Sequence, residues 1–101
     1  MKTLLFTAGP GAVTPVVGTN TIQVTSWDTP IGIVIEPDRL DDKLLLVRQN
    51  GAGNAMNIPV TEDGKEIFLH SHNREVALAM PDIYGLRGYL KGTAKVYKVT
   101  E

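Results

Sequence analysis

Apolar residues in this chain occur in short runs rich in β-branched side chains, separated every few positions by Gly, Pro, Asn or Asp. Runs of this kind are typical of strands joined by tight turns. Eight to ten short strands within 101 residues predict an all-β fold, either an antiparallel β-sandwich or a small jelly-roll-like barrel. The expected strands are Thr3–Thr7, Ala12–Val17, Thr21–Ser26, Gly32–Glu36, Lys43–Gln49, Ala55–Val60, Glu66–His70, Glu75–Met80, Ile83–Leu90 and Ala94–Val99.

Some segments predict more than a strand. Leu44–Val47 is apolar at every position, which indicates a central strand buried on both faces. Asn50–Asn54 and Asp63-Gly64 contain glycines that can adopt a positive φ, so each predicts a chain reversal, the first within a hairpin from Lys43 to Val60. The longest candidate helix, Pro37–Leu45, is expected to form little more than one turn. We expect one domain over residues 1–101, with the Gly- and Pro-rich residues 1–20 partly as an extended arm.

Composition narrows the possible partners and chemistry. Ten Lys and Arg against eleven Asp and Glu give a net charge of −1, so we expect neither nucleic acid nor an anionic membrane surface as the main partner. No apolar stretch approaches the roughly 18 residues that a membrane-spanning helix needs. The absence of cysteine excludes disulfides, thiolate nucleophiles and cysteine-ligated metal centres.

The residues His70-Ser71-His72 form the sharpest local motif, because positions i and i+2 of a strand point to the same face and can offer two imidazoles to one metal ion. With Gly64 before them and Glu75 after them, they partly resemble the first metal-binding motif of the cupin family. That resemblance implies metal ligation by His70, His72 and Glu75. The glutamate lies closer than in cupins, however, and the chain has no third histidine. We therefore interpret the histidines as half-exposed residues at a strand end and expect no metal or other cofactor.

Other candidate groups also lack the spacing of a known site. The acidic cluster Glu36, Asp38, Asp41 and Asp42 does not have the spacing of an EF-hand calcium loop, and we interpret it as a solvated turn. No serine lies in a nucleophile elbow, and no spacing predicts a pair of catalytic carboxylates. We therefore expect a protein that is not an enzyme.

Aromatic residues are spread along the chain with few basic residues between them, so we interpret most of them as packing residues rather than a base-stacking platform. The run Tyr84-Gly85-Leu86-Arg87-Gly88-Tyr89 is different, because its glycines allow a close approach of another backbone. Arg87 and Tyr89 are therefore the candidate interface residues, and an ordinary exposed strand is the alternative.

The order of segments from Ile33 to Thr100 resembles that of a known class of proteins. The segment Ile33–Val47 reads as a strand, an acidic connection and a buried strand, and Ile83–Leu90 and Gly92–Val99 close the chain. Behind a Gly/Pro-rich start, this layout is similar to small tailed-phage virion proteins that decorate capsids.

That resemblance implies an all-β, non-enzymatic protein that binds the major capsid protein on the outer surface of the virion shell and stabilises it. It also implies a homo-oligomer, for which we favour a trimer. The alternatives are a tail or fibre module of the same virion and a small cupin-like metal-binding protein.

Overall fold

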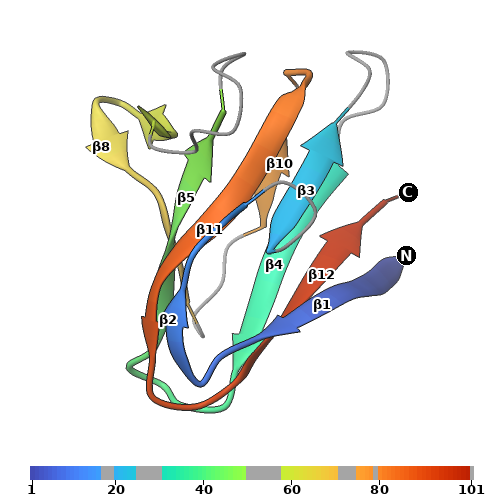
Figure 1. Cartoon of the computed structure of the whole chain (residues 1–101). Coiled ribbons are helices and arrows are strands. Elements are labelled where there is room, and N and C mark those ends of the chain that lie inside the picture. The colour runs from blue at the N-terminus through green and yellow to red at the C-terminus, as the bar shows by residue number, and fades with distance from the viewer. Residues whose placement is uncertain (17–19, 25–30, 50–57, 71–74, 79, 101) are drawn as a thin grey trace.

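The computed structural model describes residues 1–16, 20–24, 31–49, 58–70, 75–78 and 80–100. These residues form antiparallel sheets packed as a β-sandwich, with no helix among them (Figure 1). The predicted fold class is therefore confirmed. It also follows that none of the described residues belongs to a helix of the length and apolarity that a membrane crossing requires.

One layer of the sandwich is a four-stranded sheet in the order β1-β12-β4-β10. Its strands are β1 (Lys2–Ala8), β12 (Ala94–Val99), β4 (Ile31–Pro37) and β10 (Val76–Leu78). β1 shifts register against β12 between Leu4 and Phe6, which places an irregularity at Leu5. β1 and β10 are the two end strands of this sheet.

The other layer is a six-stranded sheet built on the long strand β11 (Asp82–Leu90). Along one edge β11 pairs with β2 (Gly11–Val13) and β3 (Thr21–Val24), and along the other edge it pairs with β5 (Lys43–Arg48). The far edge of β5 pairs with β6 (Ile58–Pro59) and β9 (Phe68–His70). A separate hairpin joins β7 (Thr61–Glu62) to β8 (Lys65–Glu66).

The core lies between the two layers and is filled by alternate residues of each strand. Ile33, Ile35 and Val96 from the four-stranded sheet are fully buried with Leu46 and Leu86 from the six-stranded sheet. The predicted central strand is confirmed, since β5 has neighbours on both edges and its four residues from Leu44 to Val47 are all buried. Leu45 and Val47 point away from the main core and form a small second cluster with Ile83.

Three connections between the layers lie together at the lower end of the molecule in Figure 1: β1 to β2, β4 to β5, and β11 to β12. Asp42, in the β4–β5 connection, is only 3% exposed. Its carboxylate accepts hydrogen bonds from the backbone N–H groups of Lys91 and Gly92, at 3.0–3.1 Å, in the β11–β12 connection. Asp38 adds two more contacts with Thr93, one between backbones and one from the Thr93 hydroxyl to its carboxylate.

Chain reversals are predicted at Asn50–Asn54 and at Asp63-Gly64. Asp63 and Gly64 both have positive φ and form the turn of the β7–β8 hairpin, as predicted. β5 and β6 pair as predicted for a hairpin, but the turn Asn50–Asn54 lies outside the described residues.

Two expectations were wrong. Pro37–Leu45 contains the end of β4, a turn closed by the Asp42 N–H and the Arg39 carbonyl, and the start of β5, and it forms no helix because its polar groups bond across to the β11–β12 connection. Residues 1–16 do not form an arm, because β1 and β2 are paired members of the two sheets.

Candidate interface on the six-stranded sheet

Arg87 and Tyr89, the two predicted interface residues, lie on the same face of β11. They alternate with Leu86 and Leu90, which are fully buried, so both point away from the core. Tyr89 is 71% exposed and Arg87 is also exposed. Within the described part of the chain, Arg87 makes no ion pair or side-chain hydrogen bond, which leaves its five N–H donors available to a partner.

Strand pairing brings further residues beside them. Leu45 of β5 lies directly opposite Arg87, and Phe68 of β9 lies directly opposite Leu45, so the three side chains form one row across the sheet. Lys43 lies two residues before Leu45 on β5, and His70 lies two residues after Phe68 on β9. Lys43 and His70 lie opposite each other. We call these six residues, which share the outward face of three strands, the cation–aromatic face: Lys43, Leu45, Phe68, His70, Arg87 and Tyr89.

The cation–aromatic face has an apolar floor and a polar, aromatic surface. Leu45 is 9% exposed and Phe68 is 38% exposed. The Lys43 ammonium lies 4.5 Å from the centre of the Phe68 ring, a cation–π contact that holds the lysine over the ring. Arginine and tyrosine are enriched at protein interfaces because each combines a large apolar surface with hydrogen-bond donors.

The charge of this face has one sign. None of the outward positions on the three strands is acidic: Lys43, Leu45, Val47, Phe68, His70, Ile83, Gly85, Arg87 and Tyr89. A chain with a net charge of −1 therefore carries a local positive surface here. On the described residues of these three strands, the outward side chains offer cations, aromatic rings and apolar surface for contact.

The candidate metal ligands are not brought together by what the structure describes. His70 ends β9 on the outward side of the six-stranded sheet, whereas the Glu75 carboxylate lies against Gly32 on the outward side of the four-stranded sheet. His72 lies outside the described residues. Among the residues that are described, no three His, Asp or Glu side chains gather closely enough to hold a metal ion.

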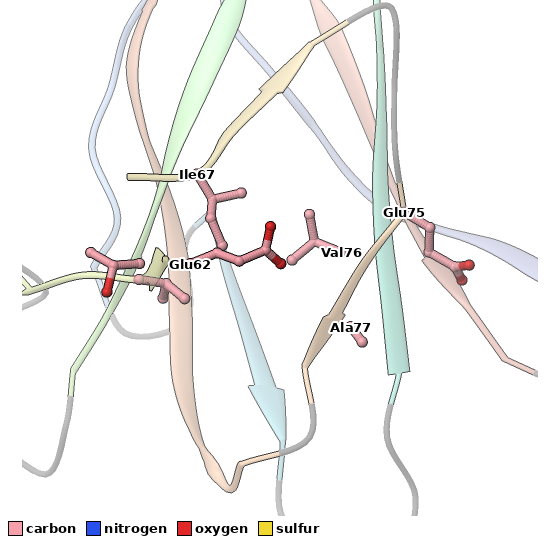
Figure 2. A pocket seen from close by; sticks show the side chains of 7 residues that line it. Glu62, Ile67, Glu75, Val76 and Ala77 are labelled. Atoms are coloured by element: carbon pink, nitrogen blue, oxygen red, sulfur yellow. The ribbon is translucent and has the colours of Figure 1, made fainter. Parts of the chain in front are cut away.

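A cavity of about 340 Å³ opens where the β6–β7 segment and Ile67 approach β10 (Figure 2). In Figure 2 the Glu62 carboxylate points toward Val76, whereas the Glu75 carboxylate points away on the other side of β10. The two carboxylates therefore do not converge in the cavity. We assign no ligand to it.

Two pairs of charged side chains near the four-stranded sheet and the connections bond to each other within the chain. The Lys2 ammonium donates to Glu36, which raises the pKa of Lys2 and lowers the pKa of Glu36. The Lys91 ammonium donates to Asp41 at 2.6 Å, and this bond lowers the pKa of Asp41. The acidic cluster is thus a set of internally bonded side chains.

Another cluster of polar contacts lies at the start of β11, near Asp82. The Arg48 guanidinium lies 4.0 Å from the Asp82 carboxylate, and the hydroxyl of the buried Tyr84 donates to the Met80 carbonyl at 2.8 Å. Burial raises the pKa of Tyr84. These groups bond to one another along the end of the core, so we interpret them as structural.

Sequence reasoning proposed Arg87 and Tyr89 as interface residues and did not single out Lys43 and Phe68, which lie beside them on this face. The alternation along each strand indicates which residues share a face, yet it does not show that β9 pairs with β5. That pairing joins residues more than twenty positions apart, so no local pattern reports it.

Comparison with known proteins adds no relative. A scan against protein-family models finds no match, and neither curated proteins nor solved structures show a significant similarity to this chain.

Proposed function

We propose that this chain is a non-enzymatic structural protein that binds another protein through the cation–aromatic face. The observation that carries the proposal is the exposure of Tyr89 and Arg87 beside Phe68 and Lys43 on a rigid, paired sheet. Residues held on strands are ordered before binding, so a partner gains their contacts at low entropic cost.

As the partner we propose the outer surface of a tailed-phage capsid, where the protein decorates and stabilises the shell. Support comes from the resemblance of the segment order to capsid-decorating virion proteins, and the all-β sandwich is compatible with it. Several copies arranged as a homo-oligomer, with a trimer favoured, would bind major capsid protein subunits together. Multivalent attachment then converts modest single-site affinity into stable binding.

The test mixes the purified protein with shells that lack it and measures bound copies by co-sedimentation. Arg87→Ala and Tyr89→Ala should each weaken binding by about 10- to 30-fold, the usual loss at an interface hot spot. Lys95→Ala is the control, because Lys95 is also exposed and cationic but lies on the four-stranded sheet.

Three outcomes would contradict the proposal. Wild-type protein that fails to bind shells, yet binds isolated tails, would make the chain a tail or fibre module. Equal losses in all three variants would show that general charge, rather than this face, drives binding. Preferential, strongly salt-dependent binding of single-stranded oligonucleotides would assign the exposed aromatic residues to base stacking.

A further inference from the structure

β1 leaves one of its backbone edges open. It is an end strand of the four-stranded sheet, paired with β12 on one side, and no described strand pairs with its other side. Among the described residues, the backbone N–H and C=O groups on that side of β1 therefore have no strand partner. A row of such groups is a template onto which another strand can add.

The side chains of β1 make this edge apolar. Residues 2–5 are all exposed, including Leu4 at 50% and Leu5 at 36%, so neither face of this half of the strand is covered. On the outward face Leu4 lies directly opposite Tyr97 of β12, and Tyr97 lies opposite Val34 of β4. The apolar row thus crosses three strands and ends at the open edge.

The usual protection of an end strand is weak here. Natural edges are blunted by lysine, proline, short length or a bulge. β1 has seven residues and no proline, and its one charged side chain, Lys2, does not guard the edge. The Lys2 ammonium reaches across the sheet to Glu36 of β4 and lies 4.4 Å from the centre of the Tyr97 ring. Only the irregularity at Leu5 remains, and it leaves Lys2–Leu4 and Phe6–Ala8 as regular segments on either side.

We propose that β1 pairs with β1 of a second copy in antiparallel orientation, which joins two four-stranded sheets across a two-fold axis. A two-fold interface places the same surface on both partners, so that surface must not repel itself. β1 meets this condition because its only charge is already neutralised by Glu36 of its own chain. The row through Leu4 would then continue into the partner's sheet without like charges facing each other.

The pairing should be weak when the copies are dilute. A seam of seven residues is much smaller than the roughly 1,600 Å² of a standard stable interface, so we expect a dissociation constant on the order of 100 µM. Sedimentation equilibrium between about 10 µM and 1 mM should therefore show a monomer–dimer equilibrium. The measured mass also separates this dimer from the trimer suggested by the resemblance.

A positive charge placed on β1 should weaken the pairing of the two β1 strands. Leu4→Lys places two ammonium groups near the axis and should weaken dimerisation at least tenfold. Leu40→Lys is the matched control, since Leu40 is 77% exposed and lies in the β4–β5 connection rather than on β1. Circular dichroism checks that both variants keep the fold. Dimerisation that survives Leu4→Lys, or is lost equally in Leu40→Lys, would place the interface elsewhere and overturn the proposal.

Single cysteines provide an independent test, because the chain has none of its own. Thr3, Leu4, Leu5 and Thr7 are each replaced by Cys, with Leu40→Cys as the control, and disulfide-linked dimer is quantified after oxidation. In an antiparallel pair a residue on the axis faces its own copy at about 5 Å, whereas a residue two positions away lies about 14 Å from its copy. A disulfide needs the Cα atoms within about 7 Å.

The cross-linking yield should therefore show one sharp maximum along β1 and fall steeply on either side. A flat profile, or a yield no greater than that of Leu40→Cys, would overturn the proposal. Wild-type protein that stays monomeric up to 1 mM would also overturn the proposal. This holds even if β1 adds to a strand of the shell, because the proposal is that β1 pairs with a second copy. None of these measurements uses shells, so a failure of the β1 pairing is distinguishable from a failure of the proposed shell binding.

Discussion

Asp42 should be the most sensitive polar residue of the fold, because one carboxylate ties two chain connections together. Both of its oxygens accept from the Lys91 N–H at 3.1 Å, and one also accepts from the Gly92 N–H at 3.0 Å. The side chain is 3% exposed, so water cannot readily replace it. Asp42→Ala leaves the part-buried N–H groups of Lys91 and Gly92 without this acceptor.

The size of the effect follows from these bonds. A hydrogen bond to a charged group contributes about 1.5–3 kcal/mol, so the loss of the acceptor for both N–H groups should lower the free energy of unfolding by about 3–6 kcal/mol. A domain of this length is expected to have about 5–15 kcal/mol in total. Asp42→Asn keeps one acceptor oxygen and should lose about half as much. At about 4–8 °C per kcal/mol, Asp42→Ala should lower the Tm by at least about 12 °C.

Urea and thermal unfolding followed by circular dichroism measure this directly. Asp41→Ala is the control, because the neighbouring carboxylate is exposed and its ion pair is with the exposed ammonium of Lys91. Exposed ion pairs contribute little, so its unfolding midpoint should stay close to that of the wild type. If Asp42→Ala unfolds at the same urea concentration as Asp41→Ala, the two backbone bonds do not hold this end of the sandwich together.

Three further predictions rest on the same structure. Burial raises the pKa of Tyr84 above its unfolded value, so its stabilising contribution is present below about pH 10 and lost as pH rises; urea midpoints between pH 9 and 11 should fall less steeply in Tyr84→Phe. The bond from Lys2 lowers the pKa of Glu36, so that contribution is present above about pH 4.5 and lost as pH falls; Lys2→Met should make the acid limb of stability against pH shallower. Gly9→Ala should destabilise more than Gly11→Ala in urea melts: both residues have positive φ, but only at Gly9 would a Cβ meet a backbone oxygen, at 2.7 Å.

The sequence carried enough information to predict the elements that depend on local pattern. β5 was recognisable because Leu44–Val47 has no polar position, which only a strand covered on both faces tolerates. The β7–β8 turn was recognisable because Asp63-Gly64 are residue types that adopt positive φ. In both cases the cause lies within a few adjacent residues.

What could not be predicted depends on contacts between distant segments. Asp42 was interpreted as part of a solvated turn because its neighbours are acidic, yet its partners are the N–H groups of residues 91 and 92. Composition predicts an exposed acidic loop, and only the proximity of the two connections turns one of its carboxylates inward. The cation–aromatic face depends in the same way on the register of β5 against β9.

The two proposed surfaces belong to different layers of the sandwich, and this separation has a consequence for how they would act together. Pairing through β1 of the four-stranded sheet leaves Arg87 and Tyr89 of the six-stranded sheet accessible. Copies attached side by side to a shell would be held at effective concentrations of about a millimolar, above the dissociation constant expected for the β1 seam. A seam that is mostly open in dilute solution would then be occupied on the shell, and each pairing would strengthen the attachment of its neighbour. Leu4→Lys should therefore weaken shell binding although Leu4 does not lie on the cation–aromatic face, and it should reduce the steepness of the binding curve more than the affinity of the first copies bound. If binding by Leu4→Lys matches the wild type at every concentration, the two surfaces do not cooperate.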